Sequence, residues 1–322
     1  MKRRNLLAMS AGLAGAVLPS VRGGRAASRT IGWISAEPQN TIAPFLQAFT
    51  SGLAAARGSE EVRVLDRYAT GGADAVAATV EELQKQGVAL IVTQGAATHF
   101  AFRAGPKVPV VFGYSADPVA AGIAASLARP GNFTGVTFMS VELMPKRIGL
   151  LRSALPECRK IGLLSNSSHF GEENEIAAAQ RAVGPAGITL HPYRTAGAGE
   201  IQPAVTRALD EGVQALVVLP SSTMVRQSPA IAAQCAARKV PFASGWADMA
   251  RAGALLTYGP NLQAAYKRVA QFALRVLDGA QPSSLPIEQP SVLELVINAR
   301  SAQSLGLTLP PTLLAQANEI IE

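Results

Sequence analysis

Short apolar runs alternate with amphipathic segments along most of the chain. Continuous apolar runs such as 89–92 and 215–219 are typical of strands that are buried on both faces of a parallel sheet. Segments between these runs, such as 73–86, place apolar residues on one helical face and charged residues away from it, which predicts helices. This alternation predicts an α/β fold in which helices cover both faces of parallel sheets.

The chain also repeats itself. Three pairs of similar segments occur in the same order, at offsets of 130, 125 and 132 residues. The pairs are TIGWISA at Thr30 with KIGLLSN at Lys160, QGVALIVTQGAAT at Gln86 with EGVQALVVLPSST at Glu211, and KVPVVFGY at Lys107 with KVPFASGW at Lys239. Because all three agree in order and nearly in offset, they predict two doubly wound lobes of similar architecture.

Three segments are expected to carry the chain between the lobes. A turn cluster, Pro-Gly-Asn, precedes a short strand within 126–138, and the segments 255–261 and 285–298 are the other candidate crossings. The helix expected at 262–277 then returns to the first lobe. The first lobe is predicted to comprise 28–138 plus about 258–288, and the second 139–257 plus about 289–322.

Residues 1–27 differ from the rest of the chain. Lys2, Arg3 and Arg4 are followed by an apolar run over 6–18, a proline and a stretch of small residues. This order is typical of an export signal, and about 13 apolar residues are too few to span a bilayer. We therefore expect export to the periplasm, without a lipid anchor because no Cys lies near the cleavage region. RRNLLA resembles a twin-arginine signal, and the choice between that route and the general secretory route stays open.

Charge and composition narrow the classes of partner. Five of the 29 basic residues lie within 1–26, which leaves 24 basic residues against 22 acidic ones and no basic stripe that would indicate nucleic-acid binding. Two cysteines and three histidines are too few for a structural zinc site, so neither a metal nor a cofactor is expected. Cys158 and Cys235 could pair in an oxidising compartment, but two separate thiols are the favoured interpretation.

Candidate ligand-binding residues follow the predicted strands. In an open α/β sheet, ligands bind outside the carboxyl ends of the strands, where loops meet helix N-termini whose free N–H groups attract anions. The candidates are Ser35, Gln94, Ala96, Thr98, Tyr114, Ser115 and Asp117 in the first half and Asn166, Ser168, Ser221, Ser222, Thr223, Trp246 and Asp248 in the second. Two lobes that face each other would enclose one polar pocket from these side chains.

The repeated segment ends on an aromatic residue in each half. Tyr114 and Trp246 hold equivalent positions, so they could clamp a flat or apolar ligand from opposite lobes. Packing of each ring in the core of its own lobe is an equally weighted alternative. Asp117 and Asp248 could hold a cationic group, and the hydroxyl groups a carboxylate. For Asp117, capping of a turn before Pro118 is as well supported as a ligand contact.

Five segments together resemble one family. They are SADPV at Ser115, SLARPGNFTGVT at Ser126, YGPN at Tyr258, LPIEQPSVLELVIN at Leu285 and SAQSLGLTLPP at Ser301. They look like the ABC-transporter substrate-binding proteins related to the binding protein for uptake of tryptophan and other aromatic amino acids. The resemblance covers essentially the whole chain after the export signal. It implies a type 1 periplasmic-binding fold with three inter-lobe crossings, a ligand in the cleft and docking to a membrane permease.

The resemblance implies binding without catalysis and without a cofactor. A ligand that contacts both lobes stabilises the closed form of the hinge, which the permease then recognises. The expected ligand is an aromatic or other amino acid, or an aromatic carboxylate. We expect the protein to be a monomer.

Two alternatives stay open at this point. The segment 113–115 begins like the nucleophile elbow of an exported serine hydrolase with Ser115 as nucleophile, although Asp117 stands where the elbow requires Gly. The histidines that a triad could use are His99, in a candidate cleft loop, and His169 and His191, which are interpreted as surface residues. The second alternative is a binding protein that signals to a membrane sensor, which the sequence does not distinguish from an importer component.

Overall fold

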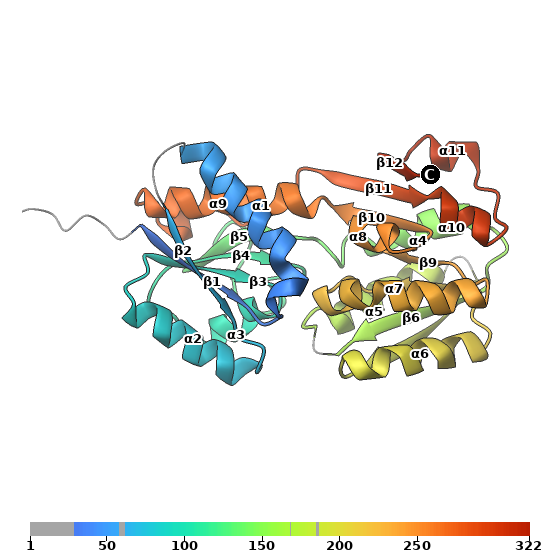
Figure 1. Ribbon diagram of the computed structural model, residues 1–322, viewed down its shortest axis with the longest axis horizontal. Coiled ribbons are helices and arrows are strands. Elements are labelled where there is room, and N and C mark those ends of the chain that lie inside the picture. The colour runs from blue at the N-terminus through green and yellow to red at the C-terminus, as the bar shows by residue number, and fades with distance from the viewer. Residues whose placement is uncertain (1–28, 58–61, 168, 185–186) are drawn as a thin grey trace, which may run out of the picture.

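The computed structural model describes residues 29–57, 62–167, 169–184 and 187–322. It contains two sheets, each packed between helices, and these form two lobes that lie side by side along the long axis of the molecule (Figure 1). The export signal predicted at 1–27 lies outside the described residues. None of the helices in the described ranges has both the length and the apolar character that crossing a membrane requires.

The first lobe is built on a five-stranded parallel sheet. Its strand order is β2-β1-β3-β4-β5, so the chain enters near the middle of the sheet and adds strands to either side. Helices α1 and α9 cover one face of the sheet and α2 and α3 the other. These elements are β1 (Thr30–Ser35), α1 (Gln39–Arg57), β2 (Arg63–Tyr68), α2 (Ala73–Lys85), β3 (Leu90–Gln94), α3 (Ala97–Ala104), β4 (Val110–Tyr114), β5 (Phe133–Thr137) and α9 (Leu262–Leu277).

The second lobe repeats this architecture and extends it. The order β7-β6-β8-β9-β10 matches that of the first sheet, and β11 and β12 are added beyond β10, antiparallel to it. Helices α4, α5, α10 and α11 cover one face and α6, α7 and α8 the other. These elements are α4 (Met144–Ala154), β6 (Lys160–Asn166), α5 (Glu172–Val183), β7 (Thr189–Thr195), α6 (Ala198–Asp210), β8 (Ala215–Val218), α7 (Ser222–Ala237), β9 (Phe242–Ser244), α8 (Ala247–Arg251), β10 (Leu256–Pro260), β11 (Leu293–Asn298), α10 (Ala299–Ser304), α11 (Pro311–Leu314) and β12 (Glu319–Ile321).

The repeated segments of the sequence occupy equivalent strands. They form β1 and β6, β3 and β8, and β4 and β9, which hold the same places in the two sheets. Every residue of β3 and of β8 is buried, because helices lie on both faces of each sheet. The prediction of two similar parallel-sheet lobes is therefore confirmed.

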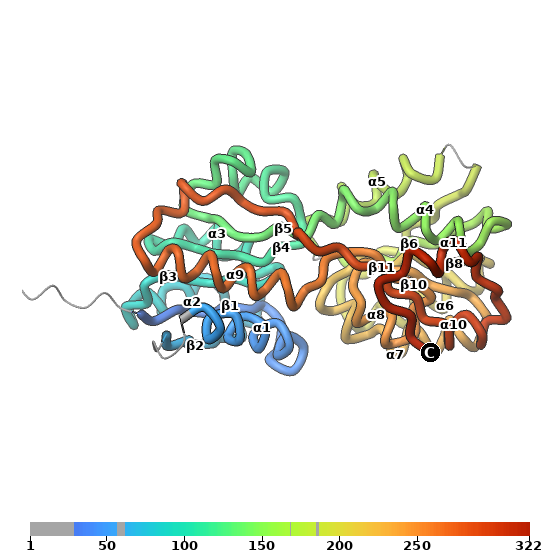
Figure 2. The backbone as a smooth tube through the Cα atoms, turned by 90° about the horizontal axis from the view of Figure 1, so that it is seen from above, coloured from blue at the N-terminus to red at the C-terminus, as the bar shows by residue number. Residues whose placement is uncertain are grey.

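The chain passes between the lobes three times. The first crossing, 138–143, joins β5 to α4; the second, at Asn261, joins β10 to α9; the third, 289–292, leads to β11 (Figure 2). Helix α9 lies against α1 in the first lobe. The second and third crossings are neighbours, because the Asn261 N–H donates to the Val292 carbonyl at 3.1 Å.

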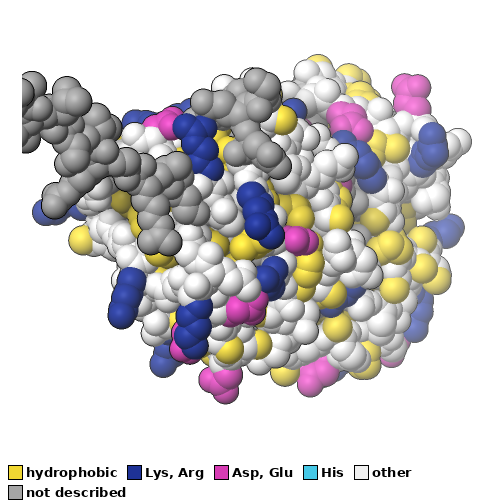
Figure 3. All heavy atoms as spheres, turned by 60° about the vertical axis from the view of Figure 1, so that its left-hand side comes forward, with side chains coloured by type: hydrophobic (Ala, Val, Ile, Leu, Met, Phe, Trp, Pro, Cys, Tyr) yellow, Lys and Arg dark blue, Asp and Glu magenta, His cyan; other side chains and the backbone are white. Residues whose placement is uncertain are grey.

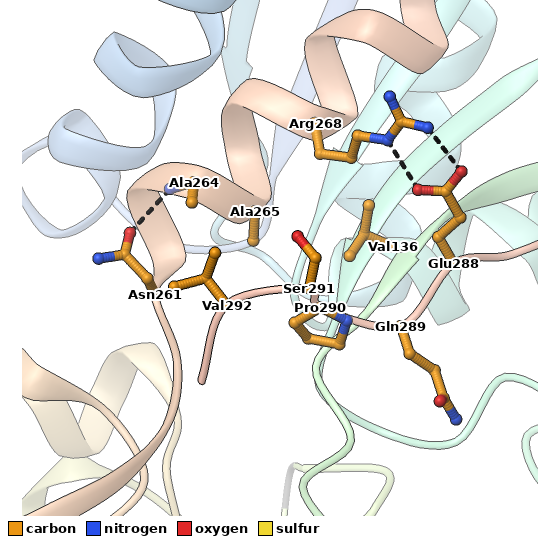
Figure 4. A pocket seen from close by; sticks show the side chains of 10 residues that line it. All are labelled: Val136, Asn261, Ala264, Ala265, Arg268, Glu288, Gln289, Pro290, Ser291 and Val292. Carbon is orange, nitrogen blue, oxygen red and sulfur yellow. Dashed lines mark hydrogen bonds and ion pairs between the residues drawn. The ribbon is translucent and has the colours of Figure 1, made fainter. Parts of the chain in front are cut away.

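An ion pair fixes the third crossing to the first lobe. Arg268 of α9 and Glu288 turn toward each other at a hollow of about 30 Å³, and two hydrogen bonds of 2.7 Å join them (Figure 4). The backbone of Glu288 also bonds to β5, donating to the Gly135 carbonyl and accepting from the Thr137 N–H, both at 2.9 Å. The residue just before the third crossing is therefore hydrogen-bonded to β5, as a neighbouring strand would be.

The two cysteines lie in different cores. Cys158 packs in the core beneath α4 and α5, and Cys235 packs in the core beneath α6 and α7. Both thiols are free, which confirms the favoured interpretation of two separate thiols. Burial raises the pKa of the Cys235 thiol to about 12, so this group stays protonated and unreactive at neutral pH.

The surface carries charges of both signs. On the face drawn in Figure 3, Lys and Arg side chains are interspersed with Asp and Glu. Among the described residues, the large apolar side chains that are exposed are Val119, Phe170, Val292 and Ile320. They come from four separate segments of the chain.

Candidate functional site

A small polar pocket lies between the two lobes. Its walls come from the ends of strands and the loops that follow them, as expected for ligand sites in open α/β sheets. The first lobe and first crossing supply Glu37, Gln94, Gly95, Ala96, Ser115 and Phe138, and the second lobe supplies Asn166, His169, Ser221, Ser222, Thr223 and Trp246. Each lobe therefore contributes half of the lining.

The N-termini of two helices border this pocket. Gly95 and Ala96 lead into α3, and Ser221 is the N-cap of α7, where its Oγ accepts from the Met224 N–H at 3.2 Å. Helix N-termini carry partial positive charge. The pocket thus offers an anion a binding position from each lobe.

A chain of hydrogen bonds links the lobes through Gln94. The Ser35 hydroxyl donates to Gln94 Oε1 at 3.0 Å, and Gln94 Nε2 donates to Ser222 Oγ across the cleft at 3.1 Å. Ser35 Oγ also accepts from the Glu37 N–H at 3.0 Å. Ser35 is fully buried, so it acts from behind the pocket wall by orienting Gln94 and the loop that carries Glu37.

Glu37 makes the second link between the lobes. Its Oε1 accepts from the Thr223 hydroxyl at 3.0 Å, and its Oε2 accepts from Arg226 Nη1 at 3.2 Å. Arg226 also donates to Thr41 Oγ1 at 2.9 Å. These bonds hold α7 of the second lobe against the first lobe.

The lobes are therefore closed on each other. The pocket has a volume of about 40 Å³, which is room for about one water molecule at roughly 30 Å³ each. Pockets for small ligands are usually of the order of 300 Å³ or more. A ligand of that size must separate the lobes, and it then takes the place of the contacts between them.

One wall of the pocket is aromatic. Trp246 is 3% exposed and meets Phe138 and Phe45 edge to face, with ring centroids 6.4 and 6.5 Å apart. Phe45 belongs to α1 of the first lobe, so the indole reaches across the interface. Apart from this wall, His99 of the first lobe stacks on Phe170 of the second at 3.7 Å.

His169 is part of the pocket wall. Its Nε2 lies 2.6 Å from Oε1 of Glu175, a carboxylate that is completely buried, and the imidazole side chain is only 12% exposed. The interpretation of His169 as a surface residue is therefore wrong, because the turn after β6 folds it inward onto α5. His99, which stacks on Phe170, is also partly buried, and this burial lowers the pKa of its imidazole.

Eight of the candidate residues line the pocket. They are Gln94, Ala96, Ser115, Asn166, Ser221, Ser222, Thr223 and Trp246. Ser168 lies outside the described residues. The structure thus gathers most of the candidates at one place, and their individual roles in binding stay predictions.

The other candidates lie elsewhere. The hydroxyls of Thr98, in α3, and Thr93, in β3, share a buried hydrogen bond of 3.1 Å, and Tyr114 packs in the first-lobe core, 1% exposed. Asp117 Oδ1 accepts from the Val119 N–H at 2.8 Å, the geometry of a capped turn. Asp248 borders a separate hollow of about 390 Å³ beside α1 and α9. In this closed arrangement none of these side chains lines the pocket.

Four lining residues, Glu37, Gly95, Phe138 and His169, are absent from the candidates drawn from the sequence, and Gly95 lies between the candidates Gln94 and Ala96. Glu37 follows β1 by two residues, so the rule that ligands bind at strand ends provided a signal for it. Phe138 lies in the first crossing, and His169 follows β6 by three residues. For these two, only the packing of the lobes shows which way the side chain turns.

The hydrolase alternative has no support from this geometry. Ser115 lines the pocket, but within the described residues no hydrogen bond joins it to a histidine. The described residues also contain no cluster of His, Cys, Asp and Glu that would hold a metal ion.

The fold and the shared pocket define a class, the two-lobe α/β binding proteins. Within this class, the profile of the ABC transporter substrate binding protein family matches residues 43–321, so the chain belongs to that family. The family is not enzymatic, and its members are extracytoplasmic.

Solved structures agree with this assignment at the level of fold. An ABC domain from Streptococcus pneumonia, in complex with L-Trp, is 24% identical with a TM-score of 0.84 and covers 91% of this chain and 99% of its own. A conserved domain protein from Vibrio cholerae is 21% identical with a TM-score of 0.83 and the same coverage. A dimeric Lac repressor shares the fold more distantly, at 14% identity and a TM-score of 0.59 over 83% of this chain and 96% of its own.

A curated relative is also similar in sequence. The tyrosine-binding protein of Clostridioides difficile is 21% identical over 209 residues. The match covers 64% of this chain and 59% of the relative.

Proposed function

We propose that the protein captures an aromatic amino acid between its lobes and delivers it to an ABC permease in the inner membrane. The observation that carries this proposal is the position of an aromatic wall, Trp246 with Phe138, beside the N-termini of α3 and α7. An aromatic side chain would pack on the wall, and the carboxylate would accept hydrogen bonds at the helix N-termini. One similar protein was solved in complex with L-Trp and another is named a tyrosine-binding protein, which supports the same ligand class.

The ligand ammonium group requires an acceptor in the same pocket. Glu37 supplies a carboxylate there, and in the closed protein its oxygens accept from Thr223 and Arg226 of the second lobe. When the lobes separate, these bonds break and the carboxylate becomes available to the ligand. Ligand contacts to both lobes then stabilise reclosure, because only the closed form makes all of them.

The site of action follows from the same proposal. The export signal at 1–27 would take the protein to the periplasm, where it would act as a monomer. Closure alters the relative position of the two lobes, and this is the change that a permease would detect.

A ligand panel tests the proposal. We expect L-tryptophan, L-tyrosine or L-phenylalanine to raise the melting temperature, since a ligand at 100 times its Kd adds about 2.7 kcal/mol to the free energy of unfolding. L-Leucine and benzoate separate the contributions of the ring and of the amino acid group. Stabilisation by leucine or benzoate and by none of the three aromatic amino acids would overturn the proposed ligand class.

A further inference from the structure

A guanidinium group lies buried where the two lobes join. Arg147 is the fourth residue of α4, and its side chain is 0% exposed. Nε donates to the Tyr258 carbonyl at 2.8 Å and Nη1 to the Ser140 carbonyl at 3.1 Å. Ser140 belongs to the first crossing, and Tyr258 lies in β10 three residues before the second, at Asn261. One side chain therefore binds the backbone of the first crossing and of the strand that leads into the second.

The same guanidinium supports the turn that carries Trp246. Among the described residues, Nη2 has no hydrogen-bond partner, and it packs against Gly245, where an added Cβ would lie 2.6 Å from it. An added Cβ on Gly259 would lie only 2.0 Å from the Gly245 carbonyl oxygen. Gly245 is thus held between Arg147 and β10, and the next residue is the indole of the pocket wall.

The buried charge is costly, which indicates that Arg147 does more than fill space. Burial lowers the pKa of the guanidinium to about 10, and Glu175 opposes that shift, so the group stays charged at neutral pH. Glu175 is the carboxylate that contacts His169 of the pocket wall. A Met or Leu side chain would occupy the space without desolvating a charge, but it could not bind the two carbonyls.

We propose that Arg147 is a positioning residue that couples the pocket to the hinge. It fixes the first crossing, the end of β10 and the turn of Trp246 relative to one another, so movement of the crossings changes the position of the indole. The ligand part of this inference rests on the proposed function, whereas the link between Arg147 and Trp246 does not.

Tryptophan emission tests the link directly. The chain has two tryptophans, and Trp33 is fully buried in the first lobe, so changes in acrylamide quenching report on Trp246. We expect Arg147→Met to shift the emission to longer wavelength, raise quenching and weaken L-phenylalanine binding about tenfold by calorimetry, because the indole is no longer held for closure. Arg147→Lys keeps the charge, so its emission, quenching and affinity should lie between those of the wild type and those of Arg147→Met. Arg152→Met is the matched control, since Arg152 is an exposed residue of the same helix.

The outcomes separate this inference from the proposed ligand. If wild-type protein does not bind L-phenylalanine but Arg147→Met still exposes Trp246, the positioning role stands and the ligand proposal fails. A lower melting temperature with wild-type emission, quenching and affinity would show a structural role only and would overturn the inference. If Arg147→Met fails to fold, acrylamide quenching of Arg147→Lys and of Gly245→Ala tests the positioning role instead. Both disturb the contact between Nη2 and the turn, and wild-type quenching in both would also overturn it.

Discussion

Tyr114 and Trp246 end the two copies of the repeated segment, yet the structure places them differently. Strand β4 extends through Tyr114, which pairs with Thr137 of β5, whereas β9 ends at Ser244, two residues before Trp246. Within a strand, the pleat directs each side chain to a face of its own sheet, whereas a residue in the following loop is free to turn toward the cleft. A difference of two residues in where the strand ends therefore decides that the tyrosine lies in the core and the tryptophan in the pocket wall.

The neighbours of the two rings show the consequence. Tyr114 packs against Phe112 of its own strand, with ring centroids 6.2 Å apart, inside the first-lobe core. Trp246 packs against Phe45 and Phe138, which are not part of the second lobe. A duplicated chain can thus keep its strands in both copies and still use one loop for the core and the other for the interface.

The largest expected effect tests the core position of Tyr114. Tyr114→Ala should lower the free energy of unfolding by about 3–5 kcal/mol, the usual cost of deleting a buried aromatic ring. Tyr114→Phe should be nearly neutral, because the hydroxyl is buried and has no hydrogen-bond partner among the described residues. Urea denaturation measures both changes. A small loss for Tyr114→Ala combined with weaker ligand binding would restore Tyr114 as a ligand clamp.

A smaller effect, on affinity, tests Trp246. Trp246→Ala should weaken binding of L-tyrosine more than tenfold, which is about 1.4 kcal/mol or more, because one wall of the pocket is lost. Isothermal titration calorimetry gives the affinity, with Trp33→Phe as the control for replacement of a tryptophan outside the pocket. Unchanged affinity in Trp246→Ala would show that this ring serves packing alone, as Tyr114 does.

The smallest expected effect concerns the ion pair between Arg268 and Glu288, beside the β5 partner of Tyr114. Glu288→Gln should cost less than about 1 kcal/mol at pH 7, because the Arg268–Glu288 pair is partly exposed and screened. The hydrogen bond from Arg268 lowers the pKa of Glu288 below its ordinary value of 4.5, so the pair stabilises the fold above that value. The difference between variant and wild type should vanish as the pH falls through the lowered pKa. Thermal melts at pH 7 and pH 3 would show a constant difference if the ion pair were not its source.

Most of the architecture could be predicted because it depends on local periodicity. The apolar runs that form β3 and β8 and the amphipathic segment that forms α2 each indicate their element from a few neighbouring residues. The candidate site was partly predictable for a related reason, since parallel strands bring their carboxyl ends to one edge of the sheet. This is why Gln94 and Ser222 were both candidates, although they are 128 residues apart.

The sequence by itself determined the elements, their order and the duplication, because hydrophobic periodicity and turn residues act over short distances. The tertiary structure alone decided that Tyr114 turns inward, that His169 faces the pocket and that Arg147, a charged residue, is completely buried. Each of these outcomes depends on partners far along the chain, such as the Tyr258 carbonyl for Arg147. The burial and direction of these three side chains are properties of the packed assembly, and no local pattern around them specifies either.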